Sequence, residues 1–214
     1  MRDDTHCPLC SALELRDFHR DRRREYRVCA RCELVFVPDC YLLDAAAERA
    51  EYDLHRNEVD DPGYRGFLSR LAVPMLERLQ PGARGLDFGC GPGPALARML
   101  EEAGCEMALY DIFYQPDDSV LSRRYDFICA TEVVEHLHRP GEELARLWAL
   151  LRPGGYLGIM TKLVRDEQAF ARWHYKNDPT HVSFFSRRSW EWWAAERQAG
   201  LEFFGADVML LQRR

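Results

Sequence analysis

The chain has 214 residues, enough for one medium-sized domain with a small appended module. Hydrophobic residues make up 47%, aromatic residues 12% and charged residues 30%, which is ordinary for a folded soluble protein and excludes a disordered chain, a collagen and a coiled coil. The formal net charge of −6 argues against a broadly basic surface for nucleic acid.

The apolar residues form no run long enough to cross a membrane, which takes about 18 to 20 residues. The first ten residues, MRDDTHCPLC, are acidic and polar and contain no apolar stretch of the kind found in a secretion signal. We therefore expect a cytoplasmic protein.

Residues 1–42 are marked by two CxxC pairs that are 18 residues apart. This spacing is typical of a zinc ribbon, and four thiolates leave no open coordination position, so the predicted metal is structural. The ligands are Cys7, Cys10, Cys29 and Cys32; the alternative is a set of metal-free cysteines. Cys40 lies outside the spacing and is expected to be buried.

The segment 20–27, RDRRREYR, lies between the two pairs. Basic residues beside a zinc ribbon can bind RNA phosphates. However, Asp21 and Glu25 interrupt the run, which favours a solvated face of a hairpin.

Residues 43–80 are predicted to form a helical cap or linker. The alanine- and glutamate-rich stretch 44–55 indicates a helix capped by Asp44, and 56–64 indicates a loop. A second helix is expected over 64–80, in which Pro74 marks a kink or a new first turn. We expect three side chains from this segment to cover a ligand bound by the rest of the chain: Tyr52, His55 and Tyr64.

Residues 81–214 alternate between apolar strand patterns and helical patterns. This order predicts an α/β domain with a mostly parallel sheet and helices on both faces. The last two strands, 201–207 and 208–214, follow each other directly, so one of them is expected to run antiparallel. The other strands are expected at 85–88, 106–111, 125–131 and 156–161, and the helices at 94–104, 141–151 and 186–200.

A glycine-rich turn follows the first of these strands, with Asp87 two positions before its first glycine. Glycines allow a sharp turn and let a ligand approach the backbone closely. Asp111 ends the next strand, 18 residues after Gly93, where an acidic side chain accepts hydrogen bonds from ribose hydroxyls. The pattern favours a nucleoside ligand, although such turns also occur without any ligand. The glycines are Gly89, Gly91 and Gly93.

Four motifs in order, LDFGCGPG, Asp111, ATEVVEHL and LRPGGYL, resemble those of class I S-adenosylmethionine (SAM)-dependent methyltransferases from about residue 81 to the C-terminus. The resemblance implies a Rossmann-like fold with SAM as cofactor. It also implies that Asp87 and the three glycines surround the methionine moiety and sulfonium. Asp111 is then expected to bind the ribose, and Glu132 to lie beside the cofactor and the substrate.

One feature departs from the family pattern. Only 14 residues separate Asp111 from Asp126, so the strand–helix unit that usually follows the second strand is reduced to a short loop. In the family, the loop of that strand–helix unit helps to hold adenine. Phe113 or Tyr114 could stack on the base instead, or both could pack in the core.

Two histidine-bearing stretches could supply the general base that a hydroxyl nucleophile needs. We predict His181 as the base, with Asp178 orienting it, and His136 as the second candidate. Alternatively, Asp178 forms a turn, His181 satisfies a backbone carbonyl and His136 holds its loop. Four aromatic residues could line an apolar substrate pocket or pack in the core: Trp173, Tyr175, Phe184 and Phe185.

The predicted function is a SAM-dependent methyltransferase that acts on a small molecule at O, N or C. The first alternative is an RNA methyltransferase that uses the zinc ribbon for recognition. The acidic total and the lack of an Asn/Asp-Pro-Pro-aromatic tetrapeptide favour the small molecule. The second alternative is a non-catalytic SAM-binding or zinc scaffold protein, against which the intact Asp87, glycines and Asp111 argue.

Overall fold

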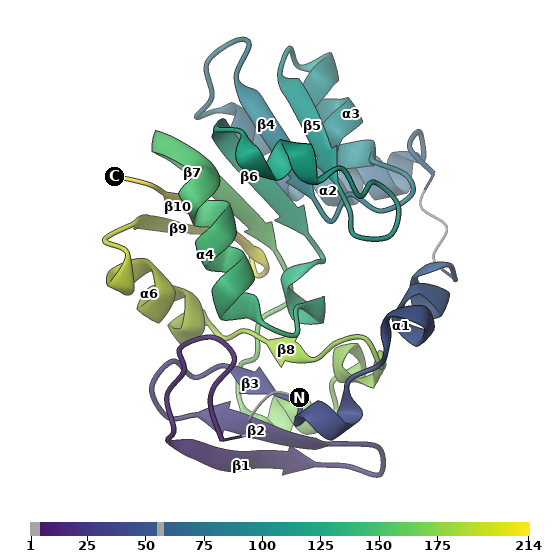
Figure 1. Ribbon diagram of the computed structural model, residues 1–214, viewed down its shortest axis with the longest axis vertical. Coiled ribbons are helices and arrows are strands. Elements are labelled where there is room, and N and C mark those ends of the chain that lie inside the picture. The colour runs from purple at the N-terminus through teal and green to yellow at the C-terminus, as the bar shows by residue number, and fades with distance from the viewer. Residues whose placement is uncertain (1–4, 55–57) are drawn as a thin grey trace.

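The computed structural model of the protein describes residues 5–54 and 58–214. It contains a small four-stranded sheet in the order β1-β2-β3-β8 and a large six-stranded sheet in the order β5-β4-β6-β7-β10-β9. The two sheets lie at opposite ends of the molecule (Figure 1). Among the described residues, no helix is long and apolar enough to cross a membrane.

The small sheet is antiparallel and joins distant parts of the chain. A hairpin of β1 (Leu15–Arg20) and β2 (Glu25–Cys29) pairs with β3 (Val35–Phe36). The fourth strand, β8 (Ser183–Phe184), comes from near the other end of the chain and pairs with β3. Residues 1–42 therefore supply three strands of this sheet, and the C-terminal part of the chain supplies the fourth.

Two helices connect the sheets. In α1 (Ala45–Tyr52), the carboxylate of Asp44 accepts hydrogen bonds from the amides of the first turn, as predicted. The second helix, α2 (Pro62–Leu76), begins two residues earlier than expected because Pro62 suits the first helical position and Asp61 caps it. Pro74 lies in the last turn of α2 and starts no new helix.

The large sheet has the predicted mixed topology. Strands β5, β4, β6 and β7 are parallel, and β10 is antiparallel to both β7 and β9. β5 is an edge strand, and the chain after it makes a short 3₁₀ turn at Asp118–Ser122. The bounds are β4 (Arg84–Phe88), β5 (Glu106–Tyr110), β6 (Tyr125–Thr131), β7 (Leu151–Met160), β9 (Gly200–Phe204) and β10 (Val208–Gln212).

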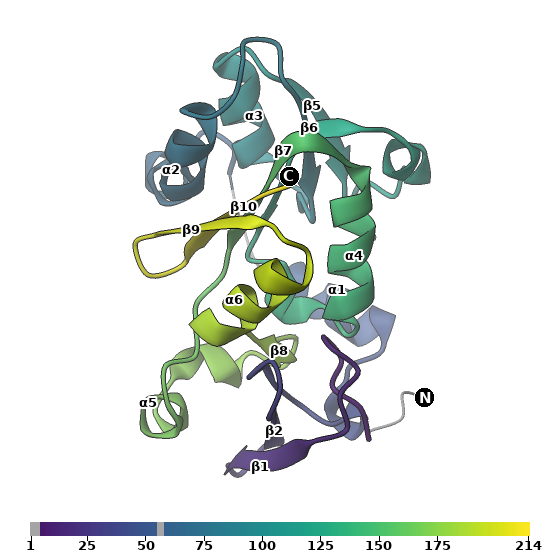
Figure 2. The same ribbon diagram turned by 90° about the vertical axis from the view of Figure 1, so that its left-hand side faces the viewer.

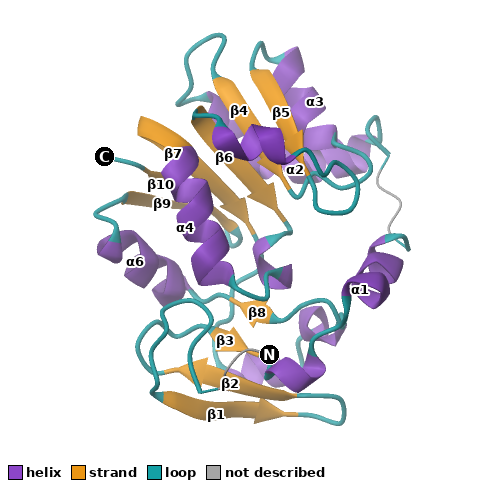
Figure 3. Ribbon diagram, in the orientation of Figure 1, coloured by secondary structure: helices purple, strands orange, loops and turns teal. Residues whose placement is uncertain are grey.

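Helices cover both faces of the large sheet (Figures 2 and 3). Successive residues of a strand point to opposite faces, so Phe127 and Cys129 pack with α2 and α3 (Ala95–Glu102). Ile128 and Ala130 pack with α4 (Pro140–Leu150) and α6 (Arg187–Glu196). The structure therefore confirms the Rossmann-like α/β fold. A short helix, α5 (Glu167–Ala171), lies beside the small sheet.

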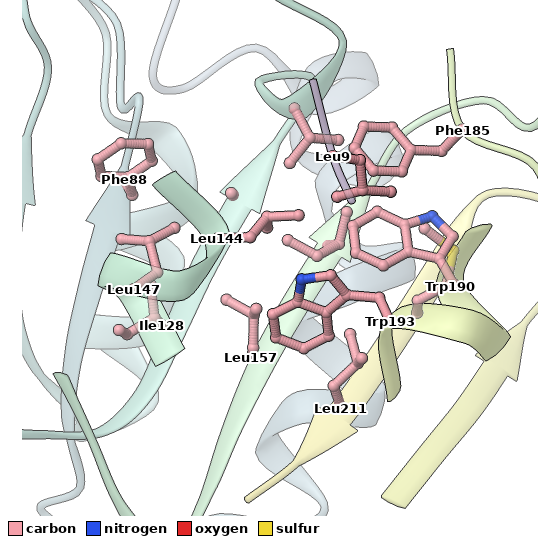
Figure 4. Packing of buried hydrophobic residues seen from close by; sticks show 14 of the residues in the cluster. Leu9, Phe88, Ile128, Leu144, Leu147, Leu157, Phe185, Trp190, Trp193 and Leu211 are labelled. Carbon is pink, nitrogen blue, oxygen red and sulfur yellow. The ribbon is translucent and has the colours of Figure 1, made fainter. Parts of the chain in front are cut away.

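The N-terminal segment and the large domain share one hydrophobic core. Leu9 packs in the same cluster as Phe185 and Trp190, whose rings stack 4.5 Å apart (Figure 4). The amide of Gly141, in the first turn of α4, donates to the carbonyl of Pro8 at 3.1 Å. A Cβ at Gly141 would lie 2.4 Å from the Leu9 carbonyl oxygen, so only glycine allows this approach.

Candidate active site

A cavity of about 810 Å³ opens at the carboxyl ends of β4, β5 and β6. Ligands of open α/β sheets bind at this edge. Its walls come from the glycine turn 89–93, the segment 110–114, the segment 131–139 and the facing sides of α1 and α2. All nine residues that the sequence predicted for the cofactor and the general base line it: Asp87, Gly89, Gly91, Gly93, Asp111, Glu132, His136, Asp178 and His181.

The glycine turn has a backbone that other residues cannot adopt at low cost. Gly89 has φ 73° and Gly91 has φ 63°. A Cβ at Gly89 would also lie 2.5 Å from the Val133 side chain. Asp87 lies under the turn with 2% of its surface exposed, and burial, followed by the charge of Asp111, raises its pKa to about 7.

Asp111 ties the glycine turn to the next loop. Its Oδ2 accepts from the amide of Gly91 at 3.0 Å, and its Oδ1 accepts from the amides of Phe113 and Tyr114 at 2.8 and 3.1 Å. The carboxylate therefore has both oxygens fixed at the cavity wall. Phe113 and Tyr114 are half-buried and line the cavity, so neither packs in the core. Stacking on a base stays a prediction.

Two of the three residues predicted to cover the ligand lie at the cavity. Tyr52 lines it from α1, with its ring centroid 5.2 Å from that of His136, and Tyr64 lines it from α2. The Tyr114 hydroxyl donates to Asp53 at 2.6 Å and so links α1 to the loop after β5. His55 lies outside the described residues.

The two candidate histidines meet at one end of the cavity. The ring centroids of His136 and His181 are 4.7 Å apart, and both residues line the cavity with Asp178. The Nδ1 of His181 lies 2.7 Å from the Tyr175 carbonyl oxygen, and the Nδ1 of His136 lies 3.3 Å from that of Thr180. A carbonyl only accepts, so in each neutral ring Nδ1 carries the hydrogen and Nε2 is the basic nitrogen.

Burial decides the charge of His181. Only 7% of its surface is exposed, and this burial lowers its pKa to about 4, even though Asp178 acts in the opposite direction. The ring is therefore neutral near pH 7. Asp178 forms the turn that the alternative interpretation expected, since it accepts from the Thr180 amide at 2.9 Å. Its Oδ2 also lies 3.7 Å from the Nε2 of His181.

A pair of buried carboxyl groups lies beside these histidines. Glu135 is fully buried, and the Tyr175 hydroxyl donates to its Oε1 and lies 3.3 Å from Oε2 of Glu132. Burial raises the pKa of Glu135 to about 8, with a contribution from the charge of Glu132, whose own pKa burial raises to about 7. Glu132 also has φ 53°, a strained backbone for a non-glycine residue. Glu135 was not predicted as a site residue, although its position next to His136 was a signal.

An arginine of the small sheet holds the loop that carries His181. Arg24 is 7% exposed, and its guanidinium donates to the carbonyls of Asp178, Pro179 and His181 at 2.9, 3.2 and 2.8 Å and also to that of Lys176. The ammonium of Lys176 pairs with Asp21 in the same hairpin. The interpretation of the basic run as a solvated face is therefore wrong at Arg24, because this residue points inward.

The four paired cysteines form one cluster, with their Sγ atoms within 4.8 Å of one another. The Sγ atoms of Cys7 and Cys32 are 3.5 Å apart, and those of Cys10 and Cys29 are 3.4 Å apart. Tetrahedral zinc with bonds of about 2.3 Å places its sulfurs about 3.8 Å apart, so the cluster fits this metal. Cys40 is exposed, so its predicted burial is wrong.

The four aromatic residues considered for a substrate pocket pack in the core instead. Phe184 contacts Phe170 with ring centroids 5.3 Å apart, Phe185 stacks on Trp190, and Trp173 stacks on Tyr175. None of the four belongs to the described lining of the cavity. Tyr175 and Phe184, with Trp173 packed against them, belong to a separate apolar cluster that includes Tyr26 and Val35 of the small sheet, whereas Phe185 belongs to the main core.

The profile of a family described as "methyltransferase domain" matches residues 56–203. The biotin biosynthesis bifunctional protein BioCD of Bordetella avium is 29% identical over 163 residues, which cover 65% of this chain and 33% of that protein. The trans-aconitate 2-methyltransferase of Deinococcus radiodurans is 30% identical over 105 residues, which cover 41% of each. The chain thus spans about a third to two fifths of these relatives' length.

Two solved structures share the fold. A SAM-dependent methyltransferase from Archaeoglobus fulgidus aligns with a TM-score of 0.53 at 16% identity and covers 70% of this chain and 94% of its own. The magnesium protoporphyrin IX methyltransferase of Synechocystis PCC 6803, solved with bound S-adenosylhomocysteine, aligns with a TM-score of 0.52 at 13% identity, covering 82% and 97%. At these identities the likeness concerns the fold alone.

Proposed function

The chain belongs to the methyltransferase domain family, and from this premise we propose that it transfers the methyl group of SAM to a small-molecule acceptor. The observation that carries the proposal is the single cavity that joins the glycine turn and Asp111 to His136 and His181. A cofactor bound at one end and an acceptor at the other would share this space. When bound, SAM supplies an electrophilic methyl carbon on a sulfonium.

The residues of the glycine turn fit the cofactor. Gly89 and Gly91 place no side chain of their own on the cavity wall, so the methionine moiety can lie close to their backbone. Asp111 presents a fixed carboxylate that can accept from the ribose hydroxyls. Asp87 and Glu132 line the same cavity, where the resemblance to the family puts them beside the methionine moiety and the substrate.

The acceptor end consists of His136, Asp178 and His181. The basic Nε2 of each ring can accept a hydrogen bond or a proton from the acceptor, and Asp178 lies close enough to His181 to orient it. In this role His181 starts neutral, since its pKa is about 4. A base of this pKa is weak for a free hydroxyl, which restricts the acceptors that it can activate alone.

Several arginines of the segment 20–27 are used within the protein, and for this reason we prefer a small molecule to RNA as the acceptor. Arg24 uses its guanidinium on internal carbonyls, so it offers nothing to a phosphate. Arg20 forms an ion pair with Glu25 at 3.3 Å within the same hairpin. Arg22 and Arg23 are exposed, but the Arg23 guanidinium donates to the Asn177 carbonyl at 3.1 Å, and the chain as a whole is acidic.

The same proposal assigns a structural zinc ion to Cys7, Cys10, Cys29 and Cys32. The donor set and spacing support it, and four thiolates leave no position for a substrate. The knuckle at Pro8 touches Gly141 at the start of α4, directly after the segment 131–139 that lines the cavity. The ion would therefore stabilise both the small sheet and one wall of the cavity.

A transfer assay with methyl-labelled SAM tests the proposal. The purified zinc-loaded protein is incubated with fractionated metabolite pools and, separately, with total RNA, and label is followed into each. We expect incorporation into a metabolite fraction and strongly reduced incorporation with Asp111→Asn. Label in RNA would identify RNA as the acceptor. Binding of SAM without transfer to any pool would favour the scaffold alternative.

A further inference from the structure

Three residues at the acceptor end lie together in the way that metal ligands do. Glu135, His136 and His181 each offer one ligand atom, and these atoms lie within 4.8 Å of one another. They come from the turn after β6 and from the loop before β8, so the fold rather than local sequence brings them together. The cluster is separate from the four cysteines and contains nitrogen and oxygen donors instead of sulfur.

In both histidines, one ring nitrogen contacts a backbone carbonyl, as is common in histidines that bind metals. A metal-bound imidazole normally uses one nitrogen for the metal and donates the hydrogen of the other to a carbonyl or carboxylate. The Nδ1 contacts with the Tyr175 carbonyl, for His181, and the Thr180 carbonyl, for His136, supply this second interaction. In both rings the Nδ1 hydrogen is directed to a carbonyl, so Nε2 is the nitrogen that would bind a cation.

The carboxyl groups supply the charge. The Oε2 of Glu135 and the Oε1 of Glu132 are buried, and within the described part of the chain neither has a hydrogen-bond partner. No salt bridge among the described residues involves either glutamate. A buried carboxylate without such a partner is costly, and a bound cation would remove this cost. The Lys162 ammonium lies 5.0 Å from the Tyr175 ring centroid, and its charge and that of Arg70 act on Glu132.

We propose that Glu135, His136 and His181 bind a divalent transition-metal ion, and that this ion holds the hydroxyl oxygen of the methyl acceptor. Two imidazole nitrogens and one carboxylate leave coordination positions open, and this mixed set suits Mn²⁺, Fe²⁺ or Zn²⁺. Glu132 and Asp178 adjoin the cluster and add negative charge on the cavity side.

This inference rests on the proposed methyl transfer and identifies the acceptor as an oxygen nucleophile. A divalent ion lowers the pKa of a bound hydroxyl, so the proton can leave to solvent without a strong protein base. The resulting oxyanion attacks the methyl carbon; the C–O bond forms as the C–S bond breaks, and the electron pair stays on sulfur as a neutral thioether. His181 would then act as a ligand of the ion and would not have to take the proton itself.

Manganese binding tests the proposal with the full zinc-loaded chain. Mn²⁺ prefers nitrogen and oxygen ligands to thiolates, so the cysteine cluster competes little. The fraction of free Mn²⁺ is followed by electron paramagnetic resonance for the wild type, Glu135→Gln and His136→Gln, with the exposed His174→Gln as the matched control. Circular dichroism checks that each variant folds.

We expect one Mn²⁺ ion per wild-type chain, with binding weakened at least about tenfold in Glu135→Gln and His136→Gln and unchanged in His174→Gln. Absence of Mn²⁺ binding in the wild type, or equal binding in all four proteins, refutes the metal site. A proton shared between the two glutamates would then neutralise the buried carboxylates. Calorimetry with SAM on the same samples separates the two proposals. Retained SAM binding without Mn²⁺ binding refutes only the metal site, whereas Mn²⁺ binding without SAM binding refutes the methyl transfer.

Discussion

Replacing Arg24 by alanine should open the loop that carries His181. The guanidinium donates to four backbone carbonyls between residues 176 and 181 while it is itself buried. A hydrogen bond that involves a charged group contributes about 1.5–3 kcal/mol, and a buried acceptor that loses its partner costs about 1–3 kcal/mol. Because the four bonds act as a unit and do not add, we expect about 3–5 kcal/mol of lost loop stability.

The expected readout is local. A loss of this size raises the open population of the loop by a factor of about 10² to 10⁴. Hydrogen exchange should accelerate accordingly for the amides of the loop and of Val182, which donates to the Glu135 carbonyl at 2.8 Å. Methyl transfer should fall strongly, while SAM affinity should change little because the glycine turn lies at the other end of the cavity.

Two further variants make the experiment decisive. Arg24→Lys should recover only part of the protection, since an ammonium has three donors and lacks the planar fork that reaches four carbonyls. Arg22→Ala, two residues away and exposed, is the matched control and should behave like the wild type. Exchange in the loop that is the same in Arg24→Ala and Arg22→Ala would refute the reasoning.

Three other predictions follow from the site and the cysteine cluster. Asp111→Asn keeps the shape of the side chain but removes its charge, so the Kd for SAM measured by calorimetry should rise about tenfold to hundredfold; an unchanged Kd would contradict the ribose assignment. The pKa of Glu135 is raised to about 8, so the metal-free wild type should lose stability relative to Glu135→Gln as the pH rises from about 4.5 to about 8. Denaturant titrations measure this, and the same pH dependence of the unfolding free energy in both proteins would contradict it. Cys32→Ser should remove the zinc found by elemental analysis and lower the Tm, and retention of full zinc would exclude this ligand set.

The fold was predictable where its signals are local in the sequence. The glycine turn, Asp111 and the strand at 125–131 are short patterns whose geometry follows from backbone preferences and parallel pairing. The cysteine cluster was also predictable, because two CxxC turns can meet at one ion. The sequence also showed that the segment after Asp111 is too short for a further strand and helix, although the edge position of β5 was not predicted.

The features that were not predicted depend on contacts between distant segments. Arg24 looked like one more member of a solvated basic run, and only the fold brings it to the loop 176–181. The strand β8 has two residues, too few for a periodic signal, yet it completes the small sheet. The aromatic residues near it were considered for a substrate pocket or for the core, and only the fold shows that they pack in the two apolar clusters that contact the small sheet.

The most direct test of the account is isothermal titration calorimetry of the zinc-loaded protein with SAM and with S-adenosylhomocysteine. We predict one site per chain for each, with the second ligand displacing the first, because the glycine turn and Asp111 face a single cavity. Absence of heat with both ligands, together with no displacement of labelled SAM, would contradict the claim that this cavity holds a sulfonium nucleoside.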